Sequence, residues 1–209
     1  TTQFITGEME IYKLPDFTNY DGVIIHGDTL YNAETIANIV QKVHDAGVPC
    51  VNLTLEVEGM ATLSMENDNG ITLLINHLVE KHGAKTINFI SGPEGNFDGE
   101  GRLNAYKKAL EEHGMEIEDH RIYFGDYHPK SGMEAVEFFA DSGLDMPDAI
   151  MAANDEMALG ALYELERRGY RIPEDIMITG YDNIYEAQNH APRITSVQRP
   201  EKELGRKAY

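Results

Sequence analysis

The polar side chains that could do chemistry in this chain stand where short apolar runs end. Asn154 and Asp155 follow the run AIMAA, and Asp182 and Asn183 follow the run IMITGY. A carboxylate accepts hydrogen bonds and a carboxamide both accepts and donates them, so together they can hold hydroxyl or amide groups of a small molecule. The pattern predicts a binding site for a small polar ligand. The alternative is that Asn154 or Asp155 simply caps the helix that follows.

Two further side chains could contribute to such a site. Arg102 lies near the start of a helix predicted over residues 101–113, where the helix dipole disfavours a cation. We therefore expect Arg102 to have a specific partner, either a ligand or an acid such as Asp182. Tyr127 ends the run RIYFGDY, and its ring could stack on the apolar face of a sugar or pack against the protein.

Motifs for catalysis or for phosphate binding do not occur. The glycine-rich stretch over 91–102 lacks a Gly-Lys-Ser/Thr ending and the G-x-G-x-x-G spacing, so we interpret it as a loop left open to admit a ligand. Five histidines share no predicted face with metal-ligand spacing: His77, His82, His113, His120 and His128. We expect a protein that is not an enzyme and has no metal and no cofactor.

Composition excludes several other classes of protein. The chain has 209 residues, 42% apolar content and a formal net charge of −19, and such a surface repels the phosphate backbone of nucleic acids. Its single cysteine, Cys50, cannot form a disulfide within one chain. Apolar stretches stay below the ~18 residues of a membrane helix, and the first residues lack a secretion signal. We expect a cytoplasmic protein with no membrane partner.

Strand and helix patterns alternate along the chain. Apolar runs predict strands over 21–27, 48–53, 86–92, 121–127, 149–153 and 176–181, and amphipathic patterns predict helices over 34–46, 69–81, 101–113, 131–142 and 156–168. Ser131 is the expected cap of its helix, with Glu134 three residues on. This alternation predicts an α/β fold with parallel sheets flanked by helices, in which ligands lie at the carboxyl ends of the strands.

Four longer stretches resemble the effector-binding domain of lac-repressor-type (LacI/GalR) transcription regulators, which has the type I periplasmic-binding-protein fold. They occur in the family's order over residues 66–93, 101–114, 147–183 and 192–208. The motifs A-N-D-x-M-A-x-G and P-E-D-I…G-Y-D-N, taken together, are highly specific for this family. The family's D-N-x-x-G pattern reads ENDNG at 66–70 here, and its R-x-x-G pattern reads RLNA at 102–105.

The resemblance implies two Rossmann-like lobes with a sugar or nucleobase held between them. The amino-terminal lobe would comprise residues 1–64 plus 198–209, and the carboxyl-terminal lobe residues 65–197. The amino lobe is expected to be incomplete, since its first strand and helix have no counterpart before residue 21 and the last strand crossing has none after residue 209. The family's ligand-contacting positions fall on Arg102, Asn154, Asp182, Tyr127, Thr54 and Met65. A homodimer is also implied.

These observations predict a ligand-sensing domain that binds a small polar molecule in the cleft between the lobes. The linked output is expected to be transcription, with DNA bound by a helix-turn-helix domain that this segment does not contain. Two alternatives are the sensor domain of a diguanylate cyclase or kinase, and the extracytoplasmic solute-binding protein of a transporter. A DNA-binding domain or a signal peptide in the full-length gene would distinguish them.

Overall fold

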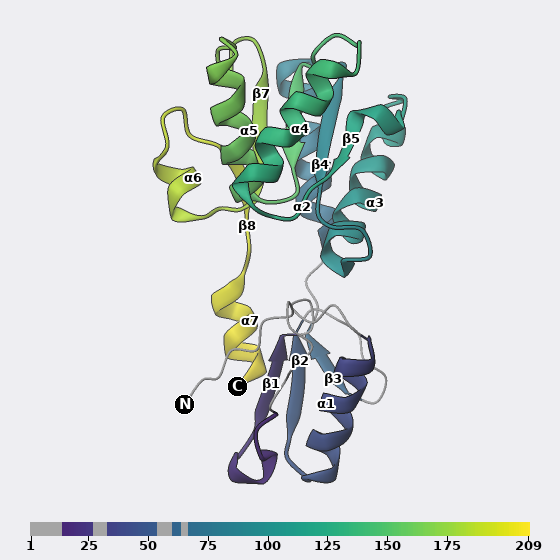
Figure 1. The fold of residues 1–209 in the computed structure, drawn as a ribbon, viewed down its shortest axis with the longest axis vertical. Coiled ribbons are helices and arrows are strands. Elements are labelled where there is room, and N and C mark those ends of the chain that lie inside the picture. Colours follow the sequence, from purple (N-terminus) through teal and green to yellow (C-terminus); the bar gives the residue numbers. More distant parts are fainter. Residues whose placement is uncertain (1–13, 27–32, 54–59, 64–66) are drawn as a thin grey trace. The chain divides into compact units, whose positions relative to one another are not determined.

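The computed structural model describes residues 14–26, 33–53, 60–63 and 67–209 of the chain. The chain divides into two compact units, of which unit 1 comprises Thr1–Met65 and Pro200–Tyr209 and unit 2 comprises Glu66–Arg199. Each unit contains its own parallel sheet (Figure 1).

Unit 1 contains a three-stranded sheet in the order β1-β2-β3, formed by Val23–His26, Cys50–Leu53 and Ala61–Leu63. Helix α1 (Ala33–Asp45) places Ile39 and Val43 on one face, where they pack with Ile25 of β1 and with Phe17. This spacing of four residues is that of an amphipathic helix against a core. A short helix, η1 (Phe17–Asn19), precedes the sheet, and helix α7 (Glu201–Ala208) belongs to the same unit.

Unit 2 contains a five-stranded parallel sheet in the order β5-β4-β6-β7-β8. The strands are β4 (Ile87–Ser91), β5 (Ile122–Phe124), β6 (Ala149–Ala152), β7 (Met177–Asp182) and β8 (Thr195–Gln198). Every residue of β4 and β6 is buried, because helices cover both faces of the sheet.

The helices of unit 2 form two layers around this sheet. One layer pairs α2 (Asn67–Asn76) with α3 (Phe97–Glu112), and the other pairs α4 (Pro129–Asp141) with α5 (Asp155–Arg167) (Figure 1). A π-helical turn, η3 (His77–Lys81), follows α2, and two short helices, η4 (Asp119–Arg121) and α6 (Tyr185–Asn189), lie in connections. The predicted alternation and the parallel sheets are confirmed.

Helices α4 and α5 approach so closely that their backbones touch. A Cβ atom on Gly132 would lie 2.0 Å from the carbonyl oxygen of Met157, and one on Gly160 would lie 1.8 Å from the carbonyl oxygen of Pro129. Both distances are far below van der Waals contact, so these two positions admit only glycine.

Two helix starts differ from the predictions. Helix α3 begins at Phe97 rather than at residue 101, because the side chain of Asn96 accepts a hydrogen bond from the backbone N–H of Gly99 and caps the helix there. Ser131 does not cap α4, whose N-cap is His128 with Pro129 in the first turn, a position that suits proline. In the described part of the chain, no helix combines the length and the apolar character that crossing a bilayer requires.

The carboxyl end of α5 contains a buried carboxylate with two cationic partners. The side chain of Glu164 is 1% exposed, and its two oxygens accept hydrogen bonds from Arg167 and Arg168, with Arg167 Nε at 2.7 Å and Arg168 Nε at 2.6 Å. The hydrogen bonds from Arg167 are the main cause that lowers the pKa of Glu164 to about 2.

This depressed pKa predicts acid sensitivity. The stabilisation by ionised Glu164 is fully present above the pKa of an unfolded glutamate, about 4.3, and is lost as the pH falls from there toward 2. Glu164→Gln should therefore be less stable than the wild type at pH 6, and the difference should shrink on acidification. Urea denaturation at a series of pH values measures it. Glu166→Gln, at an exposed neighbouring position, should follow the wild-type profile; a Glu164→Gln difference that does not change with pH would contradict the assignment.

Candidate functional site

Four of the predicted site residues lie at the carboxyl-terminal edge of the unit 2 sheet. Tyr127, Asn154 and Asp182 follow or end strands β5, β6 and β7, and Arg102 lies on α3, which follows β4. Because all five strands run parallel, their carboxyl ends share one edge. Thr54 and Met65, the other two predicted residues, lie outside the described residues.

Arg102 joins α3 to the ends of β6 and β7. Its Nη1 donates a hydrogen bond of 2.6 Å to the carbonyl oxygen of Ala153, and its Cζ lies 4.1 Å from the centre of the Tyr181 ring. Its Nη2 lies 3.5 Å from the carboxylate of Asp98, and the residue is only 2% exposed. The expected specific partner is therefore found in Asp98. The predicted position of Arg102 near the start of its helix was wrong, because α3 begins at Phe97 and places Arg102 in its second turn.

Asn154 is the N-cap of α5, as the capping alternative predicted. Its Oδ1 accepts a hydrogen bond of 3.0 Å from the backbone N–H of Met157, and its Nδ2 donates one of 2.9 Å to the carbonyl oxygen of Tyr127. The same side chain thus caps a helix and fixes the backbone of the turn after β5. A contact with a ligand stays a prediction.

Asp155, which the sequence suggested as a site residue or a helix cap, has the most buried carboxylate at this edge. Its Oδ1 accepts a hydrogen bond of 2.6 Å from the hydroxyl of Ser196, and its Oδ2 accepts one of 2.8 Å from the backbone N–H of Ile184. Burial raises the pKa of Asp155, and the hydrogen bonds from Ser196 and the backbone oppose that rise. A Cβ atom on Gly180 would lie 2.1 Å from Asp155 Oδ1. Two features of the sequence could have indicated this contact: the adjacent polar residues Asn154 and Asp155 after β6, and a glycine, Gly180, inside β7.

The same edge concentrates unusual backbone conformations. Among the described residues, three that are not glycine have positive φ, namely Tyr127 at 68°, Asp182 at 104° and Asn183 at 55°. Such conformations cost about 1–3 kcal/mol each and cluster at binding sites, where the surrounding structure holds them. Ser196 supplies such support, because its hydroxyl accepts a hydrogen bond of 3.0 Å from the backbone N–H of Asn183.

Asp182 keeps part of its side chain accessible. Its side chain is 22% exposed, and its Oδ1 lies 3.6 Å from Nη1 of Arg199. Next to it, Asn183 Nδ2 donates a hydrogen bond of 2.7 Å to Gln198 Oε1. In such a pair the carboxylate accepts a hydrogen bond from one hydroxyl group, and the guanidinium donates one to another.

Tyr127 packs against the glycine-rich loop that the sequence suggested was open for a ligand. Its hydroxyl donates a hydrogen bond of 2.8 Å to Asn96 Oδ1, the same atom that caps α3. A Cβ atom on Gly92 would lie 2.3 Å from that hydroxyl oxygen. The space that the glycines leave is therefore occupied by the tyrosine, and stacking of its ring on a ligand stays a prediction. Asn96 is a residue of this edge that sequence reasoning missed.

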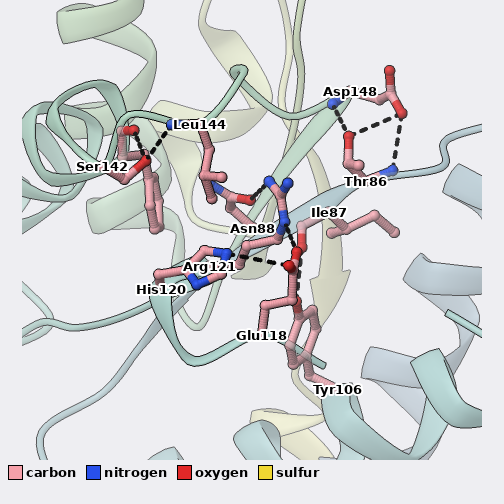
Figure 2. Close-up of polar contacts among 11 residues, drawn as sticks. Thr86, Ile87, Asn88, Tyr106, Glu118, His120, Arg121, Ser142, Leu144 and Asp148 are labelled. Atoms are coloured by element: carbon pink, nitrogen blue, oxygen red, sulfur yellow. Dashed lines mark hydrogen bonds and ion pairs between the residues drawn. The ribbon is translucent and has the colours of Figure 1, made fainter. Parts of the chain in front are cut away.

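A separate pocket lies at the opposite, amino-terminal edge of the sheet. It has a volume of about 450 Å³ and is lined by residues before β4, at the end of α3 and around η4. Figure 2 shows the polar contacts of this region, in which Arg121 donates to Glu118 and Asn88, and Asp148 accepts from the hydroxyl of Thr86. Two of its charged residues, Glu118 and Arg121, pair with each other, and open α/β sheets hold their ligands at the other edge.

The model of the periplasmic binding protein-like domain family matches residues 75–209. The HTH-type transcriptional regulator CelR of Thermobifida fusca is 35% identical over 170 residues, which are 79% of this chain and 49% of that protein. The HTH-type transcriptional repressor PurR of Salmonella enteritidis PT4 is 35% identical over 133 residues, 64% of this chain and 38% of that protein. The chain thus spans about half, or less, of the length of these curated relatives.

Solved structures give the same result. The complex of the transcriptional regulator CelR with cellobiose has a TM-score of 0.78 at 32% identity, covering 90% of this chain and 57% of that chain. A sugar-binding regulator of the LacI family from Escherichia coli, complexed with phosphate, has a TM-score of 0.79 at 27% identity, covering 90% and 66%. These likenesses confirm the predicted fold and the resemblance to effector-binding domains of lac-repressor-type regulators.

The contacts of Tyr127 generate a stability prediction that needs no ligand. Tyr127→Phe keeps the ring and loses the hydrogen bond to Asn96, so it should lower the free energy of unfolding by about 1 kcal/mol. Gly92→Ala forces a methyl group onto the hydroxyl and should cost about 1–3 kcal/mol. Urea denaturation measures both, with Tyr163→Phe as the control, since Tyr163 is 59% exposed. Equal, negligible effects of all three substitutions would show that the ring is not held there.

Proposed function

Because this chain belongs to the periplasmic binding protein-like domain family, we propose that it is a ligand-sensing domain that binds a sugar or a related polar metabolite and controls transcription. Two relatives are named as transcriptional regulators, and one solved neighbour is a complex with cellobiose. The chain spans about half of the CelR relative, so we assign DNA binding to another part of the full-length protein.

The observation that carries this proposal is the position, backbone conformation and exposure of Asp182. It is an acid with a partly exposed side chain at the carboxyl end of a buried parallel strand, it has a left-handed backbone, and its carboxylate lies beside a guanidinium. We assign to Asp182 and Arg102 the hydroxyl groups of the ligand and to Asn154 its orientation. Tyr127 covers an apolar face of the ligand, and Thr54 and Met65 are further contacts.

Binding of this kind needs few groups. A hydrogen bond to a charged group contributes about 1.5–3 kcal/mol, and micromolar affinity corresponds to about −8.2 kcal/mol. Three or four such bonds total about 4.5–12 kcal/mol, so bonds at the stronger end of the range are needed to reach that value after the cost of ordering the ligand and the side chains. A ligand favours the conformation that it binds more tightly, and this difference in affinity is the quantity that a linked domain detects.

The proposal includes the class and setting of the protein. The ligand is bound and released unchanged, so the domain acts without turnover. Its expected partner is a second copy of the chain, and its expected place is the cytoplasm, where the DNA target lies. The segment itself makes no direct contact with nucleic acid, in keeping with its net charge of −19.

Asp182→Asn tests the proposed site with the smallest change of shape. Asparagine tolerates positive φ, so the variant should fold with a melting temperature within a few degrees of the wild type. Loss of the charge-assisted hydrogen bonds should weaken ligand binding about 10- to 100-fold. Calorimetry against mono- and disaccharides, cellobiose included, and against nucleobases and nucleosides measures the affinity.

Asp175→Asn is the matched control, because its carboxylate pairs with Arg171 away from this edge. It should bind the ligand as the wild type does. If Asp182→Asn binds normally, Asp182 is not a ligand contact. If it fails to fold, the residue is structural and the site assignment is wrong.

The output is tested with the full-length protein and a fragment of its own promoter. We expect the ligand to change the affinity for DNA, and the DNA to change the affinity for the ligand by the same factor, because the coupling is reciprocal. Mobility-shift titrations and calorimetry measure the two factors. A full-length protein that instead carries a signal peptide or a cyclase domain, and does not bind DNA, would contradict control of transcription.

A further inference from the structure

Two histidine side chains converge on the surface of unit 2, away from the candidate ligand site. The Nε2 atoms of His77 and His82 lie 3.1 Å apart. Their rings are nearly perpendicular, with centres 4.7 Å apart and planes at 75°. Both residues are exposed, so the two nitrogen atoms are within reach of solutes.

The π-helical turn η3 brings these residues together. In an α-helix, residues five apart are separated by about 140° around the axis, which is why the sequence predicted no shared face for them. A π-turn, whose hydrogen bonds run from residue i to residue i+5, places residues five apart on one side. His77 begins this turn and His82 follows its last residue.

Core packing and backbone hydrogen bonds hold the turn that carries the two histidines. Leu78, next to His77, is 1% exposed and belongs to the core of unit 2. The N–H of Ala84 donates to the carbonyl oxygen of Leu78 at 3.1 Å, and the N–H of Gly83 donates to that of Val79 at 2.9 Å. The imidazoles therefore start from a rigid turn, which lowers the entropy cost of holding them together.

We propose that His77 and His82 form a two-imidazole site for a late transition-metal ion such as Zn²⁺, Ni²⁺ or Cu²⁺. An ion bound at about 2.0–2.1 Å to each nitrogen needs the two nitrogens about 3.4 Å apart in tetrahedral geometry and about 2.9 Å apart in square-planar geometry. The separation of 3.1 Å lies between these values. Two ligands on one rigid turn bind the same ion with a high effective concentration.

The donor set decides which ions bind. Imidazole nitrogen suits Cu²⁺, Zn²⁺ and Ni²⁺, whereas Mg²⁺ and Ca²⁺ take oxygen ligands. Within the described residues, no group of three or more His, Cys, Asp or Glu side chains is placed to hold a metal ion. Water molecules would complete the coordination sphere. The competing explanation of the short distance is a hydrogen bond from the N–H of one neutral imidazole to the nitrogen of the other.

Calorimetric titration of the purified chain with CuCl₂, ZnCl₂, NiCl₂ and MgCl₂ tests the proposal. We expect one Cu²⁺ site, weaker binding of Zn²⁺ and Ni²⁺, and no binding of Mg²⁺. Because the imidazoles act together, His77→Ala and His82→Ala should each weaken Cu²⁺ binding at least tenfold, and the double variant should add little to either loss. Electron paramagnetic resonance at one equivalent of Cu²⁺ should show two coordinating nitrogens.

His44→Ala is the control, because that histidine is 85% exposed on α1 of unit 1 and pairs with Asp45. It should bind Cu²⁺ as the wild type does. All the substituted side chains are exposed, so the variants should fold. Wild-type affinity in His77→Ala or His82→Ala, independent and additive losses, or a spectrum with one nitrogen would overturn the chelate and leave the hydrogen bond as the reason for the contact.

Discussion

The buried carboxylate of Asp155 fixes the edge of the sheet on which the candidate site depends. It receives the hydroxyl hydrogen of Ser196 from β8 and the backbone N–H of Ile184 from the turn after β7. The hydroxyl of Ser196 in turn accepts from the backbone N–H of Asn183. One acid thus connects three neighbouring strands, and leaving it buried without these donors would cost several kcal/mol.

This arrangement explains how unfavourable backbone conformations persist at Asp182 and Asn183. The β7 strand passes close to Asp155 because residue 180 is glycine, and the hydrogen bonds to Ser196 and Asp155 then hold the turn that follows. The strain lies at residues 182 and 183, and the groups that support it lie at 155 and 196. Some side chains at this edge therefore stabilise the turn, and others are positioned by the turn for contact with a ligand.

Other residues both stabilise the framework of this edge and are candidates for contact with a ligand. Asn154 caps α5 and holds the carbonyl oxygen of Tyr127, and Asn96 caps α3 and holds the hydroxyl of Tyr127. Arg102 bridges from α3 to Ala153 and to the ring of Tyr181. Substitutions at these positions change the framework as well as any ligand contact, which makes Asp182, with its partly exposed side chain, the cleanest position for testing binding.

Much of the unit 2 fold could be predicted from its sequence. The fully buried runs at β4 and β6 contrast with amphipathic helices, and that contrast predicts parallel strands and the edge at which Asn154 and Asp182 lie. Contacts that depend on tertiary structure could not be predicted. Helix α3 begins earlier because Asn96 caps it, Ser131 turns back to His128 and Asp126, and a π-turn replaces the expected α-helical end at His77. The role of Asp155 could not be predicted because its partner Ser196 is 41 residues away.

The glycines between α4 and α5 constrain how unit 2 can move. Where side chains interdigitate, packed helices can slide by small rotamer changes, the basis of shear motion. At Gly132 and Gly160 the contact is backbone against backbone, and no rotamer there can yield. These two helices should therefore move as one rigid body. Conformational change in this layer must then come from hinge bending in the segments that connect the layer to its neighbours.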